Sequence, residues 1–329
     1  MNTDATTSHP TFRAPSGAAL ATFAIVAGSS ILFCSKGVFV KLAYAHGAGT
    51  LSVLALRMGM SLPFFLAIAI WYSRGAEPLK ARDWAQLAGL GFLGYYVSSL
   101  VNFLGLQYVS VGLERIVLYT YPSIVLLISA FVLRKPVRSL TWGACAVAWL
   151  GIVAAFVGEM HTPKAGAHTG LGAALIFASA VTYALFILMS GSCIRRVGSM
   201  RFTGIAGSIS CLLILLHTSV GQPVRTLFAL PTPVYVDGAV LALLGTVAPV
   251  LLLAIGLQRT GPQQFAIIGT VGPVTTVFLA WFMLGERPNA IQALGFALTL
   301  GGGLAVSLLK SEPAPSKAAA PAASSLVEE

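Results

Sequence analysis

The chain alternates long apolar stretches with short polar segments between residues 19 and 309. Ten stretches hold about 20 mostly apolar residues each, the length that an α-helix needs to cross the hydrocarbon core of a bilayer. The predicted helices span residues 19–44, 49–72, 84–107, 111–132, 139–158, 169–193, 200–220, 234–258, 262–284 and 289–309. They leave no segment for a soluble domain. The pattern therefore predicts an all-α integral membrane protein with ten transmembrane helices.

Residues 105–133 and 256–284 resemble each other at a shift of 151 positions. Identical residues at this shift are Gly105/Gly256, Leu106/Leu257, Gln107/Gln258, Ile116/Ile267, Pro122/Pro273, Phe131/Phe282 and Leu133/Leu284. We therefore predict two five-helix repeats, over residues 19–158 and 169–309. Because five is an odd number, the second repeat enters the membrane from the opposite side. Such inverted repeats are typical of secondary transporters that work by alternating access.

Composition supports a membrane protein, with 57% apolar and 9% charged residues among 329. The polar residues 1–18 form a predicted cytoplasmic tail. Residues 311–329 are rich in Pro, Ala and Ser, a composition that predicts disorder. Chain termini of this kind add no domain to the ten-helix unit.

The net charge of +10 is distributed between loops and is not gathered on one nucleic-acid-binding face. With the N-terminus inside, 13 of the 20 Lys and Arg residues lie on the inner side and 2 lie within helices. The outer side receives the other five, which are Lys41, Arg115, Lys164, Arg225 and Arg287. The positive-inside rule then predicts a multi-pass protein of the cell (inner) membrane with both termini in the cytoplasm.

Polar and aromatic positions inside the predicted helices indicate a substrate-binding cavity. The candidates are Ser30, Phe33, Lys36, Tyr95, Tyr96, Ser99, Asn102, Tyr119, Thr182, Tyr183, Thr246 and Thr270. The alternative is that these side chains hold helices together by hydrogen bonds or pack in the core. Pro122 and Pro273 occupy matched positions in the repeats, and each predicts a kink or gate, because proline frees a backbone carbonyl.

Two basic residues lie within predicted helices, where charge is costly and commonly functional. Lys36 either extends its stem toward the outer interface or presents its ammonium group to a substrate carboxylate. Arg57, about two turns into the second helix, is interpreted as an interfacial or interhelical anchor.

All ten acidic residues lie in predicted tails, loops or helix ends. Glu114 opens the fourth helix, where it is expected to pair with Arg115 or to cap the helix N-terminus. A proton-driven antiporter normally uses a titratable carboxylate deep in the bilayer. The sequence therefore predicts facilitated transport without obligatory proton coupling.

Enzyme and metal motifs are absent from the sequence. The four cysteines are far apart without a C-x-x-C pair, and neither G-x-S-x-G nor H-E-x-x-H occurs. We expect no cofactor, no metal and no catalytic residue. The expected partners are a small-molecule substrate and the lipid bilayer, with no nucleic acid, and the protein is expected to be a monomer or homodimer.

An ordered set of motifs in the second repeat resembles the drug/metabolite transporter superfamily, in particular its ten-helix EamA-type exporters. The motifs are Gly256-Leu257-Gln258, Pro273, Leu284-Gly285-Glu286-Arg287, Gln292, Gly295 and Gly302, with Lys41 and Arg57 in the first repeat. The Tyr-rich segment 115–122 is similar to the YddG-type aromatic amino-acid exporters. One departure concerns the pocket, since Phe33 stands where the family commonly has Trp.

The resemblance and the positive charges inside helices together predict an exporter of small metabolites, most of all aromatic or other neutral amino acids. One alternative is a multidrug or cationic-compound exporter driven by proton antiport, which would favour buried acids. Another is a channel or receptor-like membrane protein, which would not account for the inverted duplication.

Overall fold

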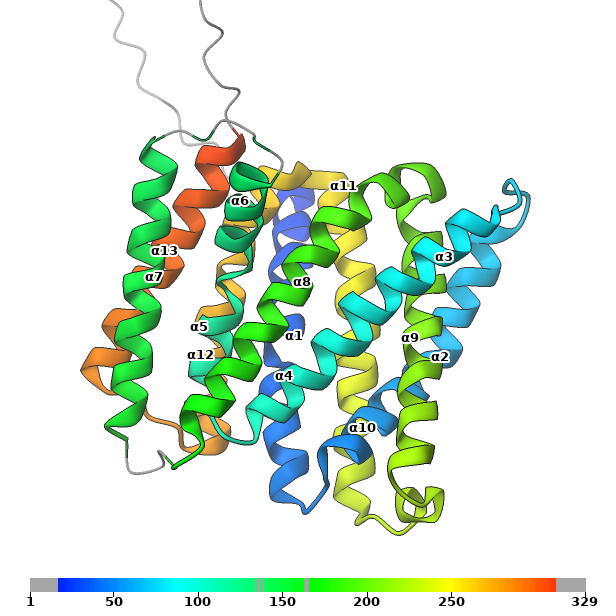
Figure 1. The fold of residues 1–329 in the computed structure, drawn as a ribbon, viewed down its shortest axis with the longest axis horizontal. Helices are drawn as coiled ribbons and strands as arrows, with labels where there is room; N and C mark the ends of the chain where they lie inside the picture. The colour runs from blue at the N-terminus through cyan, green and yellow to red at the C-terminus, as the bar shows by residue number, and fades with distance from the viewer. Residues whose placement is uncertain (1–16, 133, 135–136, 138, 163–165, 312–329) are drawn as a thin grey trace, which may run out of the picture.

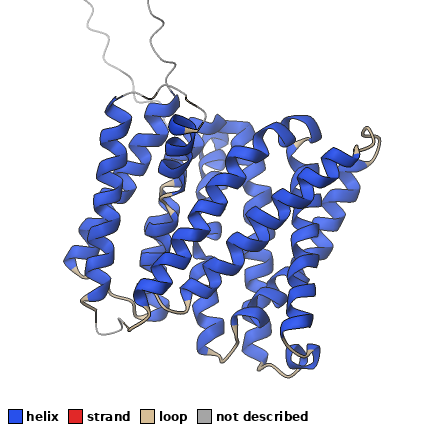
Figure 2. Ribbon diagram, in the orientation of Figure 1, coloured by secondary structure: helices blue, strands red, loops and turns tan. Residues whose placement is uncertain are grey.

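The computed structural model describes residues 17–311 except 133, 135–136, 138 and 163–165. The two predicted tails lie outside these residues, except for residues 17, 18 and 311, which belong to the first and last helices. Every regular element in the described part of the chain is a helix, and no strand occurs there (Figure 2).

The helices form one bundle (Figure 1). The α-helices are α1 (Gly17–Ala45), α2 (Thr50–Ser73), α3 (Ala81–Leu90), α4 (Ser98–Leu106), α5 (Val111–Leu118), α6 (Tyr121–Phe131), α7 (Ser139–Met160), α8 (Thr169–Val197), α9 (Ser199–Gly221), α10 (Thr232–Ala242), α11 (Ala248–Gly269), α12 (Val271–Leu284) and α13 (Ala290–Ser311). Two π-helical segments, η1 (Gly91–Val97) and η3 (Leu243–Val247), and one 3-10 helix, η2 (Val224–Phe228), complete the order.

Nine helical segments of the described residues are long and apolar enough to cross a membrane, and α13 adds a shorter apolar stretch, Ala290–Val306. This confirms the predicted multi-pass membrane protein. One predicted boundary is wrong. The sequence predicts a turn between residues 258 and 262, but α11 continues from Ala248 to Gly269. Membrane helices tolerate glycine and proline, so the Gly-Pro pair at 261–262 does not end the helix.

The two π-helical segments fall at corresponding positions of the chain. A shift of 151 carries residues 91–97 onto 242–248, which include all of η3. In each segment a backbone N–H bonds five residues back, from Ser98 to Leu93 and from Ala248 to Leu243. The sequence did not predict either segment. Such π-bulges occur frequently at functional sites.

Both copies of the repeated segment contain a helix interruption just before the matched proline. Helix α5 ends at Leu118, and α6 begins at Tyr121, directly before Pro122. Helix α11 ends at Gly269, and α12 begins at Val271, two residues before Pro273 (Figure 1). The clash between a proline ring and the preceding backbone disfavours a continuous helix at such positions.

Helices distant in sequence pack in reciprocal pairs. Helix α2 packs against α9, and α7 packs against α13. Helix α1 packs against α11 and α12, whereas α8 packs against α4, α5 and α6. The first helix of each half therefore contacts the third and fourth helical regions of the other half.

Glycines bring α7 and α13 into close backbone contact. A Cβ atom added to Gly295 would lie 2.5 Å from the backbone nitrogen of Ala155, and one added to Gly302 would lie 2.6 Å from that of Ala148. A Cβ atom on Gly151 would lie 2.5 Å from Thr299 Oγ1. Small residues allow membrane helices to approach closely enough for extensive van der Waals contact. These three positions therefore set the separation of α7 and α13.

The described chain begins and ends at the same end of the bundle, here called the termini end (Figure 1). A closed apolar layer fills the bundle near the opposite end. Its fully buried members include Val40, Phe103, Leu106, Val111 and Leu241. These side chains come from four helices, α1, α4, α5 and α10.

Candidate functional site

A cavity of about 430 Å³ lies at the centre of the bundle. It is lined by α1, α2, α8 and α9 together with η1, η3 and the interruptions before the matched prolines. Pairs of lining positions related by the 151-residue shift are Gly94/Gly245, Tyr95/Thr246, Ser98/Pro249, Ser99/Val250, Leu118/Gly269 and Pro122/Pro273. The corresponding segments of the two halves therefore face each other across one space.

The cavity extends toward the termini end of the bundle. Thr203 lines it from a position four residues after the start of α9 at Ser199, and four residues span about one helical turn. Toward the opposite end, the buried layer with Phe103, Leu106 and Val111 separates the cavity from the loops. The apolar cluster therefore lies between the cavity and the end opposite the termini.

Most of the residues selected from the sequence line this cavity. They are Ser30, Phe33, Lys36, Tyr95, Ser99, Tyr119, Tyr183 and Thr246, with both matched prolines Pro122 and Pro273. The remaining candidates, Tyr96, Asn102, Thr182 and Thr270, are not among the lining residues. Tyr96 bonds His217 at 2.9 Å, and Asn102 donates to Glu114. Thr182 and Thr270 each donate to a carbonyl three residues earlier in the chain, so these bonds do not join two helices.

Three basic side chains are buried in the cavity wall. The exposed fractions are 8% for Lys36, 6% for Arg57 and 3% for Arg115. Lys36 does not extend to the interface, since its Nζ lies 5.3 Å from the centre of the Phe33 ring inside the bundle. Gly245 lies beside the Lys36 stem, because a Cβ atom there would be in van der Waals contact with Lys36 Cβ at 3.4 Å.

Arg57 is an interhelical anchor, as interpreted from the sequence, and it also lines the cavity. Its Nε donates to Thr246 Oγ1 at 2.8 Å, and its Nη1 donates to Ser99 Oγ at 3.4 Å. The guanidinium group lies 5.3 Å from the centre of the Phe103 ring. Arg57 thus joins α2 to η3 and α4 and forms the boundary between the cavity and the apolar layer.

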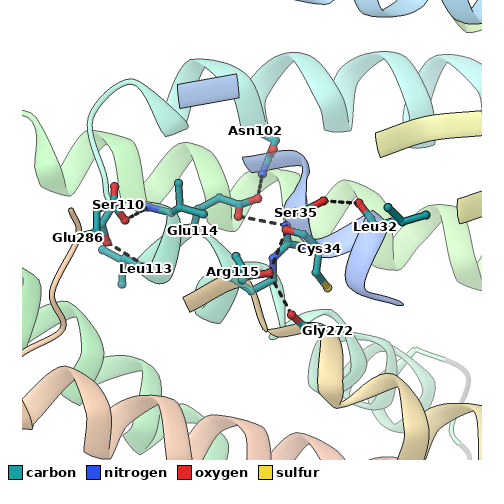
Figure 3. A network of polar contacts seen from close by, with 12 residues as sticks. Leu32, Cys34, Ser35, Asn102, Ser110, Leu113, Glu114, Arg115, Gly272 and Glu286 are labelled. Carbon is teal, nitrogen blue, oxygen red and sulfur yellow. Dashed lines mark hydrogen bonds and ion pairs between the residues drawn. The ribbon is translucent and has the colours of Figure 1, made fainter. Parts of the chain in front are cut away.

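Arg115 and Glu114 form a buried pair, and Arg115 lines the cavity. Figure 3 shows the polar contacts around this pair. Arg115 Nη2 lies 3.6 Å from Glu114 Oε2 and donates to the Cys34 carbonyl at 2.8 Å. Asn102 Nδ2 donates to Glu114 Oε1 at 2.9 Å. The atoms Arg115 Nε, Glu114 Oε2 and Asn102 Oδ1 are buried without a hydrogen-bond partner in the described residues. Unsatisfied buried polar atoms are uncommon in proteins, and here three of them lie beside the cavity.

The sequence places Arg115 among the residues of the outer side and does not predict that Arg115 and Glu114 are buried inside the bundle. The sequence predicts a helix that begins at residue 111, and α5 does begin there. Glu114 and Arg115 follow this helix start closely, which suggested that they lie at the membrane interface. The tertiary structure covers that helix start with α1, and Glu114 is 0% exposed. Gly37 allows this approach, since a Cβ atom there would lie 3.1 Å from Val111 Cγ1 at the start of α5. The expected pairing with Arg115 is confirmed.

Aromatic rings form a second wall of the cavity on the side of α6 and α8. The Tyr121 and Tyr183 rings have centroids 5.2 Å apart, and those of Tyr95 and Phe186 are 5.3 Å apart. Tyr119 contacts Tyr121 at 6.3 Å between centroids. Edge-to-face contacts of this kind add to the stability gained from burying the rings. Tyr121 and Phe186 were missed from the sequence, although Tyr121 directly precedes the selected proline.

A network of carboxylates joins the two halves at the end opposite the termini. Glu286 Oε2 accepts from the backbone nitrogen of Val111 at 2.9 Å, and Glu159 Oε2 accepts from Gln292 Nε2 at 2.7 Å. Gly285 places Glu286 there by adopting φ 65°, a left-handed conformation that favours glycine after a helix. Burial raises the pKa of the Glu286 carboxyl, and the charge of Lys41 opposes that rise.

A bundle of long apolar helices around a cavity with buried charges is the architecture of a membrane transporter. The chain belongs to the EamA-like transporter family, which it matches over residues 20–157 and again over residues 170–308. The family is part of the drug/metabolite transporter superfamily, in agreement with the resemblance of the sequence motifs.

Similar proteins carry transporter names without a stated substrate. The uncharacterized transporter YcbK of Bacillus subtilis (strain 168) is 30% identical over 282 residues, which are 84% of this chain and 89% of that protein. The uncharacterized transporter sll1319 of Synechocystis sp. (strain ATCC 27184 / PCC 6803 / Kazusa) is 25% identical over 302 residues, covering 83% and 89%. A solved structure described as a crystal structure of protein aligns with a TM-score of 0.60 at 17% identity over 90% of this chain and 99% of that one, which shows a shared fold.

Proposed function

We propose that the protein is a secondary transporter that exports small metabolites bearing a carboxylate, amino acids among them, through the central cavity. The observation that carries this proposal is the burial of Lys36, Arg57 and Arg115 around one space. A buried cation is costly unless it is paired or binds an anionic group during function. A carboxylate on the substrate supplies that partner.

The aromatic wall supports a substrate with an apolar body. Tyr95, Tyr121, Tyr183 and Phe186 face the same cavity as the three cations. A mostly apolar pocket with a few placed polar groups is typical of small-molecule sites. A metabolite with a carboxylate at one end and an apolar group at the other fits this arrangement, as does the resemblance to YddG-type aromatic amino-acid exporters.

We also propose that the halves 19–158 and 169–309 are inverted repeats that alternate between two packings. The double family match, the π segments at corresponding positions and the reciprocal packing of helices support this arrangement. Inverted repeats provide two equivalent arrangements, each open to one side. The interruptions before Pro122 and Pro273 are the positions where we expect the helices to bend during exchange.

The direction and the energy source follow from the charges. The cavity extends toward the termini end, which the distribution of Lys and Arg assigns to the cytoplasm, so the substrate enters from inside. Within the described residues, none of the lining side chains is Asp, Glu or His. Glu114, the nearest carboxylate, is held by Asn102 and Arg115. We propose gradient-driven export without obligatory proton coupling.

Counterflow in proteoliposomes tests this function. We expect saturable counterflow of a radiolabelled neutral or aromatic amino acid or its carboxylate analogue at equal pH on both sides, and no counterflow of cationic dyes. Transport that appears only with a pH gradient would contradict the proposed coupling. Movement of the dyes without movement of any carboxylate would contradict the proposed substrate class.

Thiol labelling tests the location and the open side of the cavity. Cys34 lines the cavity, whereas Cys145, Cys193 and Cys211 do not. A variant that keeps Cys34 as its single cysteine is treated with a small charged thiol reagent in sealed vesicles. It should react several-fold faster when the reagent is added at the termini side than when it is added at the opposite side. Intact mass measures the reaction. The matched variant, Cys34→Ala with the other three cysteines retained, should show no such side preference. The same side preference in both variants would contradict the location of Cys34 in a cavity that opens toward the termini end.

A further inference from the structure

The cations of the central cavity outnumber its carboxylates. Lys36, Arg57 and Arg115 line the cavity, and Glu114 is the carboxylate beside them. Within the described residues, neither Lys36 nor Arg57 has a carboxylate at ion-pair distance. The site therefore has a surplus of two positive charges. In a region shielded from water such a surplus is costly, and a bound anion reduces that cost.

One edge of the Arg115 guanidinium group has a hydrogen-bond partner at only one of its two nitrogen atoms. Its Nη2 donates to the Cys34 carbonyl, but its Nε is buried without a partner in the described residues. A guanidinium group binds a carboxylate best through two parallel N–H groups. The Nε and Nη2 atoms form one such edge on a side chain that lines the cavity.

Glu114 holds Arg115 only loosely. The distance of 3.6 Å from Nη2 to Oε2 is longer than the roughly 2.7–2.9 Å of a charge-assisted hydrogen bond. Glu114 Oε2 has no hydrogen-bond partner in the described residues, whereas Oε1 is held by Asn102. Glu114 thus partly neutralises Arg115 while leaving the guanidinium group available to another carboxylate.

We propose that the cavity selects a small organic anion without an ammonium group, whose carboxylate binds the free Nε edge of Arg115. Glu114 is the resident counter-ion of Arg115 in the empty state. The inference rests on the proposed transport function and narrows its substrate class from carboxylate-bearing metabolites to net anions, such as 2-oxo acids.

An amino acid fits this site less well than the corresponding anion. Its ammonium and carboxylate groups are attached to the same carbon, so a carboxylate placed at Arg115 brings the ammonium near Lys36 and Arg57. Like charges at such short range in a shielded site repel. None of the described lining residues is Asp or Glu, and Glu114, the carboxylate beside the site, already neutralises Arg115.

Two sets of matched compounds test the inference. The aromatic set is phenylpyruvate, phenylalanine and phenethylamine, and the aliphatic set is 4-methyl-2-oxopentanoate, leucine and isoamylamine. Within each set the apolar body is constant, while the head group is an anion, a zwitterion or a cation. Binding is measured by the shift in Tm of the purified full-length protein, and transport by counterflow.

We expect the anion of at least one set to bind roughly tenfold or more tightly than its zwitterion, because only the zwitterion brings an ammonium group near Lys36 and Arg57. The amines should not bind. Replacing Glu114 by Gln should enlarge the preference for the anion, because the surplus of positive charge increases by one. The matched substitution Arg225→Gln, at an exposed position, should leave the preference unchanged.

The outcomes separate this inference from the function on which it rests. Equal or tighter binding of the zwitterion, with counterflow, would overturn the anion preference and leave the transport function standing. Failure of all six compounds to bind or move would overturn both. A Glu114→Gln variant that folds but binds the anion more weakly would show that Glu114 is not a competing counter-ion.

Discussion

Replacing Arg115 by Gln is expected to abolish transport and to destabilise the protein by about 3–5 kcal/mol, the usual cost of breaking a buried ion pair by removing one partner. The cause is Glu114, which is 0% exposed and would keep its charge without the guanidinium group 3.6 Å away. Asn102 alone donates one hydrogen bond to it. The loss of transport follows separately, because Arg115 is the proposed anchor for the substrate carboxylate.

The double variant Glu114→Gln/Arg115→Gln separates stability from transport. It removes both buried charges, so we expect it to regain most of the stability that the single Arg115→Gln variant loses. It should remain inactive in counterflow. Thermal unfolding in detergent and counterflow in proteoliposomes are measured for both variants, with Arg225→Gln as the control at an exposed arginine. An active double variant would show that Arg115 does not bind the substrate.

Changing Gly302 to Ala is expected to destabilise the protein relative to changing the neighbouring Gly301 to Ala. A Cβ atom at Gly302 would lie 2.6 Å from the backbone nitrogen of Ala148 and 2.7 Å from the Ala144 carbonyl oxygen. At Gly301 no atom lies within 4 Å of the added Cβ. Both changes gain the same helix propensity, about 1 kcal/mol, so that contribution cancels.

The difference in stability between the two glycine variants should be about 1–3 kcal/mol, as for other overpacked sites. The obstructing atoms at Gly302 belong to the backbone of α7, so no side-chain rotation relieves the contact. Thermal unfolding of the two variants, purified side by side, measures the difference. Equal stabilities would mean that α7 and α13 do not approach each other as closely as the structure shows.

The helices were predictable because each membrane span is identified by the apolar residues of its own segment. About 20 apolar residues identify a span whatever it packs against. The structure places α1 at Gly17–Ala45 and α7 at Ser139–Met160, close to the predicted 19–44 and 139–158. The continuation of α11 through the expected turn was not predictable, since Gly and Pro break helices in water but are tolerated within membrane helices.

The polar lining was predictable only in part, because a polar residue inside a span serves either the cavity or the contact between helices. Ser99 and Asn102 lie three residues apart on one helix, but Ser99 lines the cavity and Asn102 supports Glu114 behind it. Tyr96 likewise points to His217 instead of the cavity. Spacing along a helix gives the face of a side chain, and the neighbouring helices decide what that face contacts.

The sequence by itself determined that this is a multi-pass helical membrane protein of the EamA-like type, since span length, loop charge and short motifs are local properties. Only the tertiary structure decided that Arg115 and Glu114 form a buried pair beside a cavity shared with Lys36 and Arg57. These residues come from α1, α2 and α5. Their proximity depends on helix packing, in which glycines such as Gly37 allow close approach. The sequence of any single helix does not determine that packing.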